Sequence, residues 1–191
     1  TNWVRLRTLI YLRWLAVLGQ TIAVILATQY LDIVLRLDLC LLLIGLSASF
    51  NVAAILIHPE NKRLTQRDAT LTLLFDITQL SALLYLTGGL TNPFAALILA
   101  QTIIAATVLT VAATIFLGSV SLILIGILSI DYMPLRTADG VMLETPQLLT
   151  TGSWAALSIS IVFLGVYARR VSTETFLMSE ALTATQLALA R

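Results

Sequence analysis

Apolar residues are gathered into six stretches that are separated by short polar or glycine-rich segments. The stretches lie at residues 12–30, 37–57, 69–87, 94–109, 112–130 and 148–168. An α-helix needs about 20 apolar residues to cross a bilayer core of about 30 Å, so stretches of this length are typical of transmembrane helices. The pattern therefore predicts an all-α, polytopic membrane protein with six transmembrane helices.

The boundary between the fourth and fifth stretches is the least distinct. No charged residue lies between Pro93 and Ile130. As one helix this segment would be roughly 57 Å long at 1.5 Å per residue, nearly twice the thickness of the bilayer core. The chain must therefore turn back, and we expect the turn around residues 110–114, where threonine is most frequent.

Composition agrees with this class. The chain has 59% hydrophobic and 11% charged residues and a mean hydropathy of +0.97, whereas about 25% of the residues of a soluble domain are charged. The net charge of +1 argues against a nucleic-acid partner. A single cysteine, Cys40, excludes a disulfide within the chain, and we expect it to be a small buried hydrophobic residue.

The basic residues are distributed unevenly about the six stretches. Six spans place the N-terminus, the loop at residues 58–68 and the C-terminus on one side of the membrane. All 11 Lys and Arg residues except Arg36 and Arg136 belong to that side. Basic residues are retained in the cytoplasm, so we expect both termini to be cytoplasmic. Five spans would export Arg169 and Arg170.

Residues 169–191 differ from residues 1–168, which we interpret as the membrane domain. They are polar, contain no proline or glycine, and carry a seam with alternating spacings of four and three, formed by Val171, Thr175, Met178, Leu182, Thr185 and Leu189. Such spacing is typical of a coiled coil. Two interpretations remain open: a solvated helical tail, or a cytoplasmic signalling helix that pairs two chains in a homodimer.

The third stretch contains one carboxylate and one amide side chain. Asp76 is followed one helical turn later by Gln79, so both side chains project from the same face. An ionisable group at that depth suggests function by default. The alternatives are a structural hydrogen bond between helices, with Gln101 as a candidate partner, or snorkelling toward the interface.

The segment Gly88-Gly89-Leu90-Thr91-Asn92-Pro93-Phe94 separates the third and fourth stretches. Gly88 or Gly89 can adopt φ > 0 and end the third helix. Asn92 can cap the fourth helix, with Pro93 at its first position. On these grounds alone the segment can be simply a tight helical hairpin.

The same residues also suit a quinone ring. The glycines expose backbone N–H groups, Asn92 carries an amide donor, and Phe94 offers an aromatic face. A quinone is flat, is apolar on its faces and has two carbonyl acceptors. Fixed donors prefer the oxidised form, and that differential affinity could shift a two-state helix arrangement. The candidate quinone-binding residues are Gly88, Gly89, Asn92, Pro93 and Phe94.

This segment resembles the GGxxNPF heptapeptide of the RegB/PrrB-type redox-responsive sensor histidine kinases, and all its fixed positions match. Similarity extends to residues 5–14, 85–87, 168–171 and 177–179. The resemblance implies six membrane spans in a bacterial inner membrane and ubiquinone binding at the heptapeptide. It also implies control of a kinase that phosphorylates a response regulator, and signalling together with a terminal oxidase. None of the kinase segments is recognisable here, so we expect no catalysis from this chain itself.

Two other functions remain open. A small transporter or channel would be expected to carry polar groups in several spans around a midplane site. A structural partner of a respiratory complex would need no ligand site. The chain shows no phosphate-binding glycine loop and no metal-ligand cluster, and its single histidine cannot supply a catalytic triad.

Overall fold

The computed structural model describes residues 4–57, 63–143 and 145–189. Within these residues the chain is almost entirely helical, and the expected all-α class is confirmed. The helices are α1 (Leu6–Gln29), α2 (Leu37–Ile57), α3 (Gln66–Leu86), α4 (Leu97–Val108), α5 (Val111–Ile130) and α6 (Gln147–Leu189). Two 3₁₀ turns, η1 (Gly89–Thr91) and η2 (Pro93–Ala96), lead from α3 into α4.

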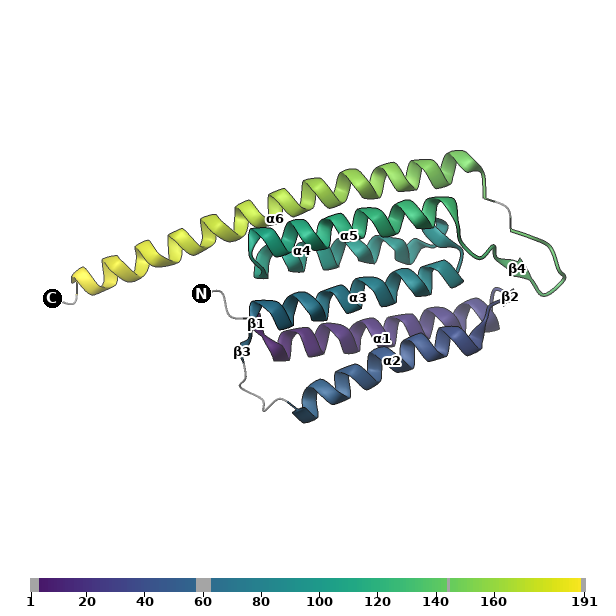
Figure 1. Cartoon of the computed structure of the whole chain (residues 1–191), viewed down its shortest axis with the longest axis horizontal. Helices are drawn as coiled ribbons and strands as arrows, with labels where there is room; N and C mark the ends of the chain where they lie inside the picture. The colour runs from purple at the N-terminus through teal and green to yellow at the C-terminus, as the bar shows by residue number, and fades with distance from the viewer. Residues whose placement is uncertain (1–3, 58–62, 144, 190–191) are drawn as a thin grey trace.

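Two pairs of very short antiparallel strands tie the loops together at opposite ends of the bundle (Figure 1). At one end β1 (Val4–Arg5) pairs with β3 (Arg63–Leu64). At the other end β2 (Ile33–Val34) pairs with β4 (Arg136–Thr137). We call these the β1–β3 end and the β2–β4 end. The heptapeptide Gly88–Phe94 lies at the β2–β4 end.

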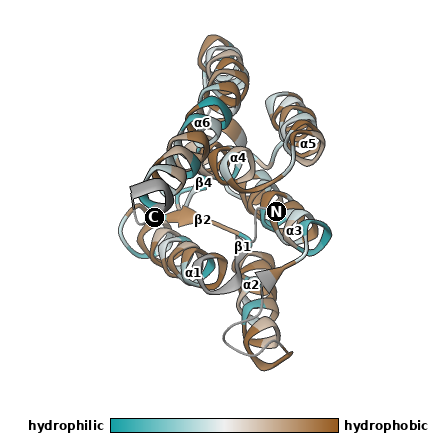
Figure 2. Ribbon diagram, turned by 90° about the vertical axis from the view of Figure 1, so that its left-hand side faces the viewer, coloured by the Kyte–Doolittle hydropathy of each residue, from teal (hydrophilic) through white to brown (hydrophobic). Residues whose placement is uncertain are grey.

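The helices consist largely of hydrophobic residues, as the colouring of the ribbon in Figure 2 shows, and many of these residues are exposed. Large side chains that would be buried in a soluble protein point outward: Leu15 is 66% exposed, Ile115 64% and Phe163 64%. In the described part of the chain five helices, all except α4, are long and apolar enough to cross a membrane. The apolar segment Pro93–Val108, which contains α4, is shorter, so six crossings remain a prediction.

The turn that divides the long uncharged segment lies where threonine predicted it. α4 ends at Val108 and α5 begins at Val111. Thr110 caps α5, because its side-chain oxygen accepts a hydrogen bond from the backbone N–H of Ala113 at 3.4 Å. From α3, the side-chain oxygen of Gln66 also accepts a hydrogen bond from the N–H of Thr110 at 3.0 Å.

The last helix, α6, is one uninterrupted helix of 43 residues. It runs without a break past Ala168, where we expected the membrane domain to end, and continues beyond the other helices at the β1–β3 end (Figure 1). Residues 173–186 are all exposed. The helical tail is therefore present, whereas pairing along its seam remains a prediction.

Cys40 is completely buried, in agreement with its expected role as a small hydrophobic residue. It belongs to a cluster in which α1, α2 and α3 meet, with Val17, Ile44 and Leu83. A second cluster joins α3 to α4, α5 and α6 near the β2–β4 end, and includes Leu84, Leu90, Ile98 and Ile161. The second cluster includes Leu90 of the heptapeptide and so holds the turn against the helix ends.

Candidate functional site

Both glycines of the heptapeptide adopt a left-handed backbone, with φ of +97° at Gly88 and +65° at Gly89. An added Cβ would lie 2.9 Å from Leu135 at the first position and 2.7 Å from the Tyr132 ring at the second. Glycine is therefore required for the backbone conformation and for the close packing of the α5–α6 loop. Both glycines are buried, so these side chains cover the backbone that we expected to be exposed.

Asn92 caps η2 as predicted. Its side-chain oxygen accepts a hydrogen bond from the N–H of Phe94 at 2.9 Å, with Pro93 at the first position. Its amide nitrogen donates to the backbone oxygen of Thr87 at 3.1 Å and to the hydroxyl of Thr87 at 2.8 Å. Both amide hydrogens are used within the turn. The sequence-based expectation that Asn92 offers a free donor is therefore corrected.

A cavity of about 310 Å³ lies beside the turn, between α1 and α3. We call it the α1–α3 cavity. Its walls are Gln20, Ala23, Val24, Leu26, Ala27, Leu31, Ile33, Leu35, Leu80, Leu83, Leu84, Thr87, Thr91, Asn92, Pro93, Phe94 and Leu135. Three of the five candidate quinone-binding residues, Asn92, Pro93 and Phe94, line it. Gly88 and Gly89 do not, because they lie behind the turn against the α5–α6 loop.

The cavity has an exposed rim and a buried polar end. Phe94 at the rim is 40% exposed, whereas Gln20 is only 7% exposed. Gln20 lies nine residues before the end of α1, which places it about 14 Å below the β2–β4 end at 1.5 Å per residue. The sequence analysis did not single out Gln20. The signal that could have identified Gln20 is an amide side chain in the middle of an otherwise apolar stretch.

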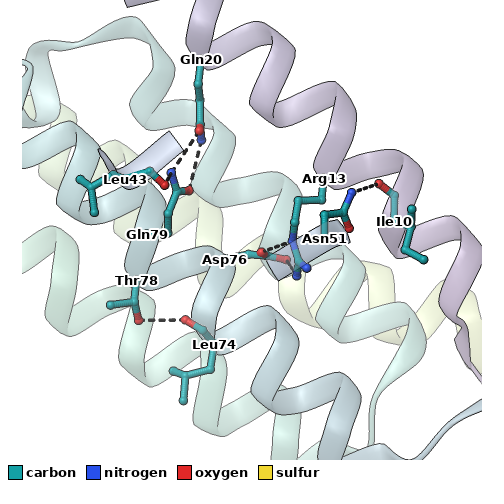
Figure 3. A network of polar contacts seen from close by, with 9 residues as sticks. All are labelled: Ile10, Arg13, Gln20, Leu43, Asn51, Leu74, Asp76, Thr78 and Gln79. Atoms are coloured by element: carbon teal, nitrogen blue, oxygen red, sulfur yellow. Dashed lines mark hydrogen bonds and ion pairs between the residues drawn. The ribbon is translucent and has the colours of Figure 1, made fainter. Parts of the chain in front are cut away.

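Asp76 does have an intramembrane partner, but that partner is Arg13 and not Gln101 (Figure 3). The Arg13 guanidinium donates to the two carboxylate oxygens at 2.7 and 2.9 Å. It also lies 4.7 Å from the centre of the Phe50 ring, which stacks on Phe75. Arg13 lies inside the first apolar stretch, although the charge distribution counts it with the basic residues of the N-terminal side. It is instead buried in α1, because its charge is neutralised there.

Gln79 is bound to Gln20 rather than to Asp76 (Figure 3). The Gln79 amide nitrogen donates to the Gln20 oxygen at 3.1 Å and to the backbone oxygen of Leu43 at 3.4 Å. The Gln20 nitrogen donates back to the Gln79 oxygen at 3.4 Å. Asp76 and Gln79 of α3 thus each bind a separate polar residue of α1, and they join the helices at two levels.

At the β1–β3 end, polar side chains of α3 and α6 converge on the last turn of α4. The Gln66 amide donates to the backbone oxygen of Val108 at 3.4 Å. Arg169 donates to the backbone oxygen of Leu109, and Ser172 donates to that of Thr107 at 3.0 Å. These carbonyls have no partner further along α4. These bonds fix the point where α6 leaves the bundle to the C-terminal end of α4. The N-terminal end of α4 follows the heptapeptide.

The fold and the cavity together define a helical membrane domain with a ligand-sized, largely apolar pocket near one end. Comparison with known proteins gives the kind of protein to which such a domain belongs. The chain is 48% identical over 190 residues to the "Sensor histidine kinase RegB" of Cereibacter sphaeroides, and 49% identical over 190 residues to a protein of the same name from a particular strain of that species.

Both similarities cover the whole of this chain and 41% of each relative, so the chain spans less than half the length of the proteins it matches. No family model matches the chain, and no solved structure matches it. The resemblance to the RegB-type sensor histidine kinases that the heptapeptide indicated is thus confirmed over the full chain.

Proposed function

We propose that this chain is the redox-sensing membrane domain of a sensor histidine kinase, and that it binds ubiquinone in the α1–α3 cavity. The observation that carries this proposal is the position of the cavity against Asn92, Pro93 and Phe94. Ligand sites are concave and mostly apolar, with a few polar groups that fix orientation. This cavity has that character, since only four of its lining side chains are polar: Gln20, Thr87, Thr91 and Asn92.

The size and placement of the cavity suit a quinone head group. A volume of about 310 Å³ lies at the lower end of the range for small-molecule sites, roughly 300–1,000 Å³. It accommodates a substituted ring and not a long isoprenoid chain. The rim at Phe94 is exposed, so the chain would extend outward into the lipid. Phe94 would contact the ring or the first isoprene unit.

The heptapeptide turn acts in this proposal chiefly through its shape. Asn92 holds Thr87 and Phe94 at fixed positions through its three hydrogen bonds. Gly88 and Gly89 allow the α5–α6 loop to close over the back of the turn. A ligand that displaced Asn92 or Phe94 would move the start of α4, and α4 is bonded at its far end to α6.

In the whole protein we propose that α6 carries this movement to a kinase that phosphorylates a response regulator. The relatives are sensor histidine kinases by name, and such a role requires that the β1–β3 end face the cytoplasm. The exposed tail of α6 is the segment suited to bring two chains together as a homodimer. The membrane would be the bacterial inner membrane.

The test is quinone binding by the purified protein in lipid nanodiscs. Quinone that co-purifies is extracted and identified, and short-chain ubiquinone is then titrated into quinone-free protein. Ala23→Phe, which fills the cavity from α1, should lower affinity more than tenfold, and Phe94→Ala should lower it severalfold. Asn92→Ala should also weaken binding, because it removes the three hydrogen bonds that hold Thr87 and Phe94 in place.

Ala53→Phe is the matched control, because Ala53 is exposed on α2 and does not line the cavity. It should bind ubiquinone as the parent does. If Ala23→Phe and Phe94→Ala also bind as the parent does, the assigned site is wrong. If the parent protein binds no ubiquinone, the function itself is wrong.

A further inference from the structure

The hydrogen-bonding capacity of the α1–α3 cavity is unequally distributed among its four polar side chains. Thr87 donates its hydroxyl hydrogen to the backbone oxygen of Leu83 at 2.8 Å. Thr91 donates to the backbone oxygen of Gly88 at 2.7 Å. Asn92 gives both amide hydrogens to Thr87. Each of these side chains has therefore used every hydrogen that it can donate.

Gln20 differs from the other three. Its amide nitrogen carries two hydrogens, and among the described residues only the Gln79 oxygen receives one, at 3.4 Å. Gln79 has no amide hydrogen left to donate, since it gives one to the Gln20 oxygen and the other to the backbone oxygen of Leu43. Gln20 lines the cavity, whereas Gln79 does not. The spare donor thus belongs to the residue that a ligand can reach.

The surroundings of this donor make it costly to leave without a partner. Gln20 is 7% exposed and lies in the interior of a helix that we take to cross the membrane. Bulk water does not reach the interior of a bilayer, so an amide hydrogen without an acceptor there lacks the hydrogen bond that water would otherwise provide. A ligand with a carbonyl oxygen at this end of the cavity would supply that hydrogen bond.

We infer that Gln20 is the residue that hydrogen-bonds a ring carbonyl of the bound quinone, and that Gln79 is the positioning residue that holds the Gln20 amide. This inference rests on the proposed function and names the polar contact within that site. The ring would enter past Phe94, with its faces against the apolar side chains of α1 and α3. One carbonyl would then lie at the buried end, against the Gln20 amide nitrogen.

The hydrogen bonds of Gln79 also determine how the Gln20 amide is oriented. The Gln79 amide nitrogen is held by the Leu43 backbone oxygen, which directs the Gln79 oxygen toward the Gln20 nitrogen. The reciprocal bond from the Gln79 nitrogen to the Gln20 oxygen then fixes which end of the Gln20 amide is the donor. Three helices, α1, α2 and α3, thereby define the position of a single N–H group.

The experiment uses the purified protein in nanodiscs with short-chain ubiquinone, in two samples that carry ¹³C at one ring carbonyl or at the other. Infrared difference spectroscopy measures the labelled C=O stretch, which falls in frequency when the oxygen accepts a hydrogen bond. The parent should show one lowered carbonyl band. Gln20→Met, which keeps the length of the side chain without a donor, should return that band to its frequency in an apolar solvent and lower affinity about threefold to tenfold.

Gln101→Met is the matched control, because Gln101 is half-buried on α4 and lies outside the cavity walls. It should keep the parent spectrum and the parent affinity within twofold. Gln79→Met should broaden or partly shift the lowered band, because the Gln20 amide loses its support while its donor remains.

The outcomes separate this inference from the function on which it rests. No ubiquinone binding by the parent would overturn the proposed function. Binding by the parent with both carbonyl bands unshifted would overturn the role of Gln20, and that result needs no variant to fold. A lowered band and parent affinity that persist in Gln20→Met would overturn it as well.

Discussion

The guanidinium of Arg13 binds the carboxylate of Asp76 through two hydrogen bonds of 2.7 and 2.9 Å, and so joins α1 to α3 across 63 positions of the chain. The side chains are 4% and 15% exposed. In the apolar surroundings of a membrane neither charge could be left there alone. The pair therefore explains how two charged residues can lie inside helices that are otherwise apolar.

This pair predicts a strong difference between single and double substitutions. Asp76→Leu should destabilise the protein by about 3–5 kcal/mol, because it leaves the Arg13 charge buried without a partner. Arg13→Met should destabilise the protein by a comparable amount, because it leaves the Asp76 carboxylate buried without a partner. The double variant should be less destabilised than either single variant, since neither charge remains. Reversible unfolding in mixed micelles measures all three, and additive losses would show that the two residues are not coupled.

The left-handed backbone at Gly89 predicts a second effect on stability. Gly89→Ala places a methyl group 2.7 Å from the Tyr132 ring at φ +65°. We expect a loss of about 1–3 kcal/mol, from the conformation and the overpacking together.

Gly45→Ala in α2 is the control for this prediction, because nothing lies within 4 Å of an added Cβ there. It should be neutral, or stabilising by up to about 1 kcal/mol, since alanine favours a helix more than glycine does. Thermal unfolding of the two variants side by side makes the comparison. Equal stability would mean that the Tyr132 contact does not form.

The distribution of basic residues predicts the orientation of the bundle. Reporter fusions after Arg63 and after Arg170 should be active as cytoplasmic fusions, and a fusion within residues 136–145 should be active only as a periplasmic one. This result requires α4 to cross the membrane despite its short length. A periplasmic signal after Arg170 would contradict six crossings and would leave α4 within one leaflet.

The tail of α6 predicts a dimer contact with a defined face. Cysteines at Met178 or Leu182 lie on the seam and should cross-link two chains, whereas cysteines at Glu180 or Ala184 on the opposite face should cross-link much less. All four positions are exposed in this structure, so differences in yield would report on pairing and not on burial. Equal yields on the two faces would indicate a solvated tail.

The helix boundaries could be predicted because they depend on local sequence. Apolar stretches gave α2, α3 and α5 to within a few residues, and Asn92 acts as the predicted cap. Thr110, which caps α5, lies in the threonine-rich segment where we expected the turn. α1 was expected from residue 12 and begins instead at Leu6. The arginines near the start of this helix made it resemble a polar segment before the membrane span. Only the packing of α1 beside α3 shows that the charge of Arg13 is paired with Asp76.

The candidate site was predicted only in part, for a related reason. The heptapeptide was located from its own residues, and three of them line the cavity. Gln20 and Leu31 could not be placed there, because they come from a helix and a loop that are distant in sequence. Whether the Asn92 amide was free also depended on Thr87, whose hydroxyl position follows from how α3 ends. Spacing along a chain does not determine such contacts.

Because α6 is unbroken, the number of residues in it determines the direction in which the side chains of its tail face. α6 forms one continuous rod of 43 residues without proline, so the angle between the side chains of Trp154 and Leu182 about its axis is set by the number of residues between them. Each residue advances the helix by about 100°. One residue inserted after Arg170 would therefore turn every later side chain by that angle about the axis, whereas seven would restore the original facing almost completely. The angular setting of this rod, and not only its presence, is then a property that the membrane domain specifies.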